Sequence, residues 1–203
     1  MNPISAIIEK QGFVILDGGL ATELENRGAD LDHALWSARL LDEDPVLIRD
    51  VHLAYLEAGA DVIATSSYQA SFQGFKACGF SQEQAVDLLR LSSSLALQAR
   101  DSFWRDSVRR KGRCKPLVAL SIGPYGASLH DGSEYHGNYG VSRQELVDFH
   151  RPRMALLAET GADLFAFETI PSLEEAEVLL EMLQEFPGNP AWLSFSCKDG
   201  ERV

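Results

Sequence analysis

The chain has few cysteines, no long apolar run and no recognisable leader, and each shortage excludes a class of protein. Its three cysteines, Cys78, Cys114 and Cys197, are widely spaced and form no Cys-x-x-Cys pair. They therefore predict neither a disulfide framework nor a structural zinc site. No apolar run approaches the ~20 residues of a membrane helix. The N-terminus lacks the basic, apolar and small-residue order of a signal peptide, so we expect a cytoplasmic protein.

Basic side chains are also scarce. Lys and Arg total 18 against 30 for Asp and Glu, which gives a net charge of -12. Such a surface repels phosphate backbones and anionic membranes, so we expect no nucleic acid and no membrane among the partners. The basic cluster at 105–115 has no accompanying aromatic stacking pattern, and we interpret it as a solvated connection.

What the chain does contain is an alternation of short apolar segments and longer amphipathic ones. Each apolar segment is typical of a strand buried on both faces, and together they cover 13–16, 61–65, 117–121, 163–167 and 191–195. Helical patterns between them cover 45–58 and 81–100 and begin after Ser142 and Ser172, each of which opens a capping-box motif. This order predicts a parallel sheet with right-handed crossovers.

A weak internal repeat indicates that the units are equivalent. The segments at 57–64 (EAGADVIA) and 159–166 (ETGADLFA) both read as a helix end, a glycine, an aspartate and a strand. We therefore predict about five βα units of a (β/α)8 barrel, which needs ~250 residues when complete. An open, doubly wound sheet is the alternative, although no Gly-x-Gly-x-x-Gly turn follows the first strand.

Polar residues follow the predicted strands, where both folds bind their ligands. Asp17 and Glu168 are carboxylates at two such strand ends. They could hold an ammonium group, or instead cap a helix and pair with an arginine. Glycines after Asp17 would let backbone amides approach a carboxylate. The hydroxyl-rich run at 65–69 favours ligand contact, so the sequence indicates a site for a small zwitterion such as an amino acid.

Two further segments carry candidate chemistry with weaker support. The stretch at 129–140 is rich in Gly and Tyr and contains His130 and His136. It is too irregular for a metal motif and is better interpreted as a lid. Lys198 could form a Schiff base, but the adjacent Asp199 favours a solvated surface lysine.

Taken together, the motifs resemble one enzyme family along nearly the whole chain. The segments are, in order, 13–24 (FVILDGGLATEL), 35–38 (LWSA), 59–71 (GADVIATSSYQAS), 132–135 (GSEY), 167–171 (FETIP) and 194–200 (SFSCKDG). They resemble homocysteine S-methyltransferases, above all the branch that uses S-methylmethionine. The resemblance implies a (β/α)8 barrel that transfers a methyl group from S-methylmethionine, or a similar sulfonium, to L-homocysteine and gives methionine.

The resemblance also implies a substrate pocket, formed here by Asp17, Gly18, Trp36, Ser37, Thr65, Tyr68 and Glu168. Asp17 and Glu168 would receive the homocysteine amino group. Gly18 and Ser37 would lie near the amino acid, and the other three would line the pocket.

Zinc is the cofactor that the resemblance implies, because the family binds the homocysteine sulfur to zinc as a thiolate. The family's ligands are a cysteine ending strand six and an adjacent cysteine pair near strand eight. This sequence has no Cys-Cys pair, and Cys197 matches a non-ligand position, so we expect no metal ligand here. Residues 1–203 are thus expected to be one homocysteine-binding domain, the N-terminal part of a barrel truncated before its C-terminal strands. The alternatives are a catalytically inactive remnant and, last, a lyase or aldolase using Lys198.

Overall fold

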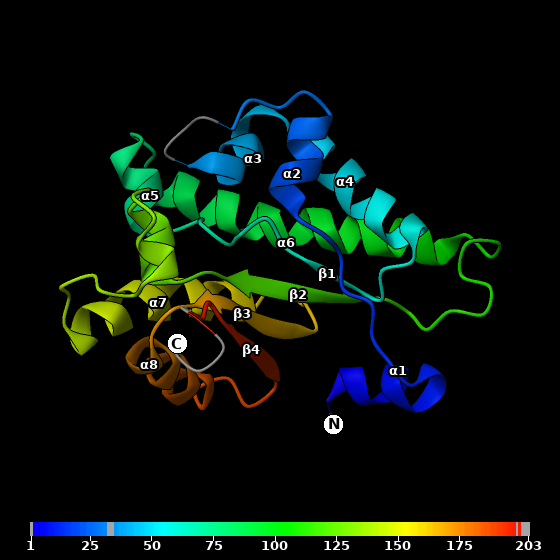
Figure 1. Cartoon of the computed structure of the whole chain (residues 1–203). Helices are drawn as coiled ribbons and strands as arrows, with labels where there is room; N and C mark the ends of the chain where they lie inside the picture. The colour runs from blue at the N-terminus through cyan, green and yellow to red at the C-terminus, as the bar shows by residue number, and fades with distance from the viewer. Residues whose placement is uncertain (1, 32–34, 198, 200–203) are drawn as a thin grey trace.

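The computed structural model describes residues 2–31, 35–197 and 199, with Trp36 described by its backbone alone. A parallel sheet is flanked by helices (Figure 1). Its strands, in spatial order, are β1 (Val62–Ala64), β2 (Leu117–Ile122), β3 (Leu164–Ile170) and β4 (Ala191–Phe195). This sequential order is that of a barrel, whereas a doubly wound sheet reverses its order at a switch point. The predicted partial (β/α)8 barrel is confirmed.

The segment predicted as the first strand lies beside β1 but forms only a single bridge, between Leu16 and Val62. The Asp17 amide donates to the Val62 carbonyl at 3.0 Å, and the Val62 amide donates to the Ile15 carbonyl at 3.2 Å. Phe13 and Ile15 are 58% and 45% exposed. The prediction of a strand buried on both faces was therefore wrong for 13–16: the described chain leaves the face that carries Phe13 and Ile15 exposed, and no described strand pairs with the outer edge of the segment.

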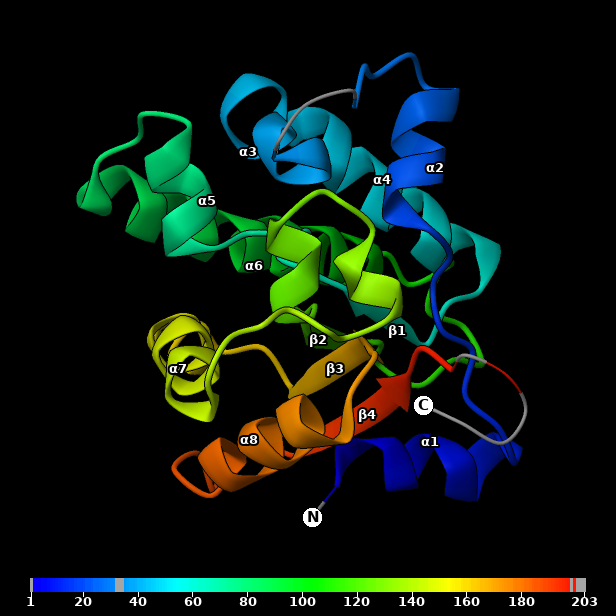
Figure 2. The same cartoon turned by 60° about the vertical axis from the view of Figure 1, so that its left-hand side comes forward.

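The helices of the described chain, four of which the sequence predicted, flank the sheet (Figure 2). They are α1 (Pro3–Gln11), α2 (Leu20–Asn26), α3 (Leu40–Glu43), α4 (Pro45–Ala58), α5 (Phe72–Ala77), α6 (Gln82–Arg105), α7 (Arg143–Ala158) and α8 (Leu173–Leu183), with the short 3-10 turns η1 (Trp36–Arg39), η2 (Tyr125–Ser128) and η3 (Ser133–Tyr135). The predicted starts of α7 and α8 are confirmed, since the hydroxyls of Ser142 and Ser172 accept hydrogen bonds from the amides three residues on.

The internal repeat has a physical cause at the start of two strands. Asp61 accepts a hydrogen bond from the Ile15 amide at 3.0 Å, and Asp163 accepts one from the Val118 amide at 2.8 Å. Each carboxylate also pairs with an arginine, Arg113 at 3.5 Å for Asp61 and Arg100 at 3.0 Å for Asp163. The repeated aspartate therefore ties each strand to the preceding one.

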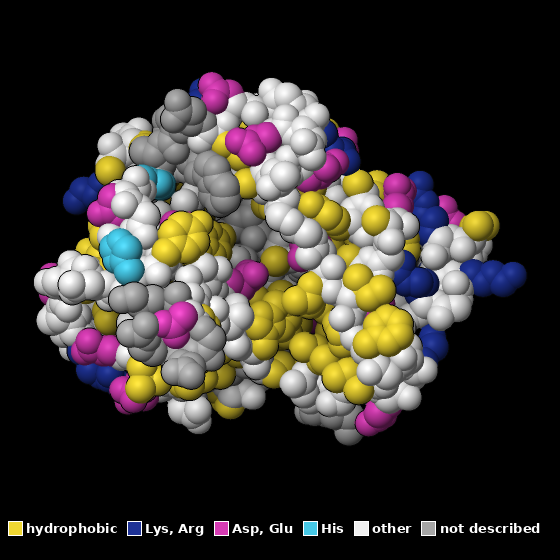
Figure 3. Space-filling model, in the orientation of Figure 1, with side chains coloured by type: hydrophobic (Ala, Val, Ile, Leu, Met, Phe, Trp, Pro, Cys, Tyr) yellow, Lys and Arg dark blue, Asp and Glu magenta, His cyan; other side chains and the backbone are white. Residues whose placement is uncertain are grey.

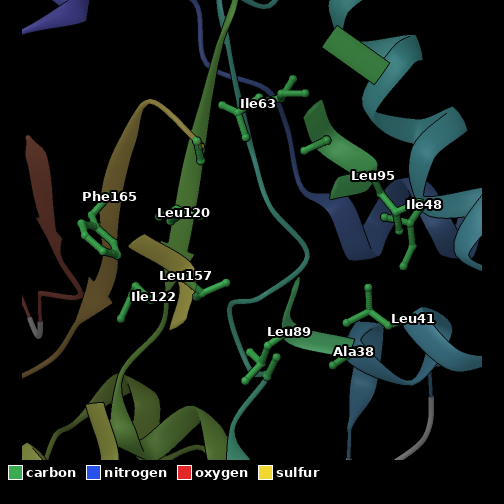
Figure 4. Packing of buried hydrophobic residues seen from close by; sticks show 14 of the residues in the cluster. Ala38, Leu41, Ile48, Ile63, Leu89, Leu95, Leu120, Ile122, Leu157 and Phe165 are labelled. Atoms are coloured by element: carbon green, nitrogen blue, oxygen red, sulfur yellow. The ribbon is translucent and has the colours of Figure 1, made fainter. Parts of the chain in front are cut away.

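Alternate side chains of the strands contribute to two hydrophobic clusters. One cluster packs the sheet against the outer helices, and Figure 4 shows part of it, with Ile63, Leu120, Ile122 and Phe165 from the strands near Ile48, Leu89, Leu95 and Leu157 from the helices. The other lies on the inner face, where Val62, Ala119 and Ala166 pack with Ile7 of α1. Burial on both faces explains why the strand sequences are apolar throughout.

Some large hydrophobic side chains beside the sheet are exposed. The large hydrophobic residues Phe13, Leu16 and Phe195 are 58%, 52% and 39% exposed. Figure 3 shows hydrophobic side chains gathered around a hollow, with acidic side chains inside it. None of the described helices has the length and hydropathy needed to cross a bilayer.

Candidate functional site

A cavity of about 460 Å³ opens at the carboxyl ends of the strands. Six of the seven predicted pocket residues line it, namely Asp17, Gly18, Ser37, Thr65, Tyr68 and Glu168. The side chain of the seventh, Trp36, lies outside the described part of the structure. The fold thus brings together residues that are separated by as many as three predicted helices and three predicted strands, while their roles toward a substrate stay predictions.

Asp17 is positioned by the strand beside it. One of its carboxylate oxygens accepts a hydrogen bond from the Ala64 amide, at the end of β1, at 2.8 Å. Burial raises the pKa of Asp17 to about 7, and the nearby charge of Glu168 adds to the rise, while the Ala64 amide opposes it. Asp17 therefore changes charge near neutral pH when no cation lies beside it.

Glu168 is turned toward the cavity by an irregularity in β3. The pairing of β3 with β4 shifts register between Phe167 and Ile170, and Thr169 adopts a positive φ of 60°. A β-branched residue rarely adopts this conformation, and such strain concentrates at functional sites. The Ser121 hydroxyl donates to Glu168 at 2.6 Å. Burial raises the pKa of Glu168, and the Ser121 hydrogen bond opposes that rise.

Neither carboxylate has the purely structural role that the sequence also allowed, which was a helix cap for Asp17 and a pair with an arginine for Glu168. The Glu168 partner is a serine, and among the described residues no arginine pairs with it. The helix after Asp17, α2, begins after Gly19 and has no side-chain cap. Both carboxylates instead face a cavity without a neutralising partner from the described residues that line it.

Buried hydroxyl groups form the floor of the site. Thr65 and Ser67 share a hydrogen bond of 2.6 Å, and Ser67 donates to the Ser121 carbonyl at 2.7 Å. The Ser121 amide donates to the Thr65 hydroxyl at 3.0 Å. Ser66 lines the cavity, is only 2% exposed, and its hydroxyl has no hydrogen-bond partner among the described residues. A ligand could supply that partner.

Two glycines make room for aromatic side chains near the cavity. A Cβ on Gly18 would lie 2.9 Å from the Tyr55 ring, and one on Gly123 would lie 2.8 Å from the Tyr68 ring. The Tyr55 hydroxyl donates to the Gly19 carbonyl at 3.1 Å. Burial raises the pKa of Tyr68, so its hydroxyl stays protonated and able to donate. Any larger residue at Gly18 would displace Tyr55 and the cavity wall.

Sequence reasoning assigned no individual role to several residues that line the cavity, namely Ser121, Glu134, Tyr135, Thr169 and Trp192. Ser121 and Thr169 stand directly at strand ends, so the strand-end rule selects their segments without giving either residue a role. Glu134 and Tyr135 lie in the segment interpreted as a lid, and only the fold shows that this segment reaches the cavity.

No metal centre is formed by the described residues, among which no three His, Cys, Asp or Glu side chains are grouped to hold an ion. Cys78 and Cys114 are half-buried, Cys197 is exposed, and all three are free. Lys198 lies outside the described residues.

Comparison with known proteins decides the family. The sequence model described as homocysteine S-methyltransferase matches residues 14–203. The chain belongs to the homocysteine S-methyltransferase family. The protein named homocysteine S-methyltransferase YbgG, from Bacillus subtilis (strain 168), is 54% identical over 203 residues, which are 100% of this chain and 64% of that protein. A selenocysteine Se-methyltransferase of Brassica oleracea var. italica is 51% identical over 203 residues, covering 96% of this chain and 59% of its own length.

A solved structure agrees with this family assignment. The metallated form of the homocysteine methyltransferase MmuM from Escherichia coli superimposes with a TM-score of 0.93 at 46% identity, covering 100% of this chain and 69% of that chain. The chain therefore spans less than two thirds of the length of the curated family members described above.

Proposed function

We propose that this protein binds L-homocysteine and transfers to its sulfur a methyl group from S-methylmethionine or a similar sulfonium donor. The observation that carries the proposal is the pair of buried carboxylates, Asp17 and Glu168, in a cavity whose described lining includes no Lys, Arg or His. An ammonium group between them would offset the burial that raises the pKa of Asp17, together with the smaller contribution from the charge of Glu168. Family membership supplies the reaction class.

The reaction balances without an oxidant. The homocysteine thiol loses its proton to solvent, and the sulfur lone pair forms a new bond to the donor's methyl carbon. The bond from that carbon to the donor sulfur breaks, and the donor leaves as a neutral thioether. Asp17 and Glu168 act by binding and orienting the acceptor, which places its sulfur for attack. The selenocysteine Se-methyltransferase among the relatives suggests that a selenol is a further acceptor to test.

Zinc is implied by the family resemblance alone. Its use by this protein is a proposal that the described residues do not support by themselves. Thiolate ligands are what a sulfur-activating zinc site requires. The cysteines of the described chain are free, and no three His, Cys, Asp or Glu side chains there are grouped to hold an ion. We therefore assign these residues to substrate binding and derive no step through a metal.

This lack of fit favours a second candidate, a chain that binds homocysteine without transferring a methyl group. Both candidates bind the homocysteine ammonium group between Asp17 and Glu168, the ammonium site. They differ in whether methionine is produced. The cytoplasmic location and the lack of nucleic-acid or membrane partners remain predictions of the sequence.

Isotope transfer discriminates between the candidates. The chain is incubated with zinc, S-methylmethionine and homocysteine deuterated in its carbon chain, and mass spectrometry follows the label. Deuterated methionine above the protein-free background supports transfer, and a Glu168→Gln variant is expected to reduce it. Homocysteine binding without deuterated methionine, and no zinc by elemental analysis, would instead support the second candidate. Failure to bind homocysteine would contradict both.

The affinity for homocysteine is expected to rise with pH. Only ionised Asp17 attracts the ligand ammonium, and burial raises the pKa of Asp17 to about 7. The ionised fraction grows from about 9% at pH 6 to about 91% at pH 8, so the association constant should rise about tenfold. Calorimetric titrations at the two pH values measure this rise, and Asp17→Asn is expected to remove it. An equal rise in that variant would assign the titration to another group.

A further inference from the structure

The cavity contains more carboxylates than are required to bind the ammonium group of one amino acid. Glu134 lines it in addition to Asp17 and Glu168, and no cationic side chain appears among the described lining residues. A zwitterionic amino acid brings one ammonium group, which the Asp17 and Glu168 pair can hold. The third carboxylate therefore has no counter-charge from the described lining or from the acceptor.

Glu134 and Tyr135 reach the cavity on η3, the turn at Ser133–Tyr135. The pair interacts directly, since a hydrogen bond to Glu134 raises the pKa of the Tyr135 hydroxyl. The charge of Glu134 also contributes to the raised pKa of Tyr68, which lines the same cavity. A carboxylate beside two aromatic rings is an environment that attracts an organic cation.

The segment that carries Glu134 is anchored by a buried cluster. Glu175, which is 0% exposed, accepts hydrogen bonds from the Tyr125 amide at 2.6 Å and the Tyr139 hydroxyl at 2.9 Å, on either side of η3. It also pairs with His150 at 2.8 Å. A Cβ on Gly126 would lie 2.6 Å from the Glu134 amide nitrogen. The η3 turn therefore packs closely against η2, and Glu175 fixes the segments on both sides of it.

We propose that Glu134, held in the cavity wall by the Glu175 cluster, is the counter-charge for a positively charged methyl donor and sets the preference for that donor over its neutral product. This inference rests on the proposed function and adds a specificity residue to it. Glu134 attracts the cationic sulfonium before transfer. After transfer the donor is a neutral thioether, which Glu134 no longer holds, so the same contact favours product release.

Paired titrations with S-methylmethionine and methionine test the inference, because the two ligands share the amino-acid group and differ by one methyl and one positive charge. Glu134→Gln is expected to weaken S-methylmethionine binding about 5- to 20-fold and to leave methionine binding within about twofold. Glu134→Asp should retain most of the preference. The control is Glu159→Gln, whose side chain is 73% exposed on the far end of α7 and should change neither affinity.

The outcomes separate this inference from the proposed function. An unchanged ratio of the two affinities in Glu134→Gln, or an equal loss for both ligands, overturns the role of Glu134 while homocysteine binding and transfer can stand. A wild-type chain that binds homocysteine but shows no preference for S-methylmethionine overturns the inference alone. Loss of all amino-acid binding overturns both.

Discussion

Asp17→Asn is expected to weaken L-homocysteine binding by about 30- to 100-fold. The substitution keeps an oxygen for the Ala64 amide, which donates to Asp17 at 2.8 Å, but removes the negative charge that faces the ligand ammonium. A hydrogen bond to a charged group contributes about 2–3 kcal/mol, which corresponds to this loss of affinity. Isothermal titration calorimetry of the wild-type chain and the Asp17→Asn variant above pH 7.5 measures this loss of affinity, because wild-type Asp17 is mostly ionised there.

The same substitution should stabilise the unliganded fold. The pKa of Asp17 rises from an ordinary 3.8 to about 7 on folding, so the neutral acid is favoured in the fold. The stabilisation of the fold by the neutral acid is fully present below pH 3.8 and is lost as the pH rises through about 7. Asp17→Asn should therefore increase the free energy of unfolding at pH 8 by about 1–3 kcal/mol, with little change at pH 4. Asp42→Asn, at an exposed position of α3, is the control. A less stable Asp17→Asn protein at pH 8 would contradict the account.

Glu175→Leu is expected to lower the free energy of unfolding by about 3–5 kcal/mol. It removes the acceptor for the Tyr125 amide, the Tyr139 hydroxyl and His150. It also leaves Arg153, which is 1% exposed, without a compensating carboxylate. Chemical denaturation gives the change, and the thermal midpoint should fall by roughly 6–20 °C for a chain of this size.

The protonation state of this cluster follows from its donors. Arg153 can only donate, so the Nδ1 atom of His150 accepts from it at 2.8 Å, and Nε2–H donates to Glu175. Burial, together with the charge of Arg153, lowers the pKa of His150 to about 4. The cluster therefore stays intact across neutral pH. Glu177→Gln on the exposed face of α8, where the side chain is 57% exposed, should cost less than about 0.5 kcal/mol. A similar small effect for Glu175→Leu would show that the cluster contributes little.

Four helices, α4, α6, α7 and α8, and the strands β1 to β4 could be predicted because their signals are local, whereas α1, α3 and α5 were not predicted. Asp44 and Pro45 mark the start of α4, and Gly59, with a φ of 120°, follows its end. The segment at 13–16 carries the same apolar signal, yet it forms one bridge and leaves Phe13 exposed. Whether an apolar segment becomes a regular strand depends on the neighbours on both sides, which the segment itself does not encode.

The candidate site was predictable to the extent that it follows the strand ends. Asp17 and Glu168 stand directly after apolar segments, and the parallel topology brings them to one cavity. The turn of Glu168 toward the cavity depends on the register shift at Thr169, which no local pattern indicates. Glu134 lines the cavity on a segment that Glu175, far along the chain, anchors on both sides, and no local pattern indicates this contact.

The most direct test of the ammonium site compares L-homocysteine with 4-mercaptobutyrate, which has the same thiol and carboxylate but no amino group. Calorimetric titration of the chain at pH 8 gives both affinities. We expect homocysteine to bind about 100-fold or more tightly, because only its ammonium group can engage Asp17 and Glu168. Equal affinity for the two thiols would contradict the assignment of these carboxylates and, with it, the proposed function.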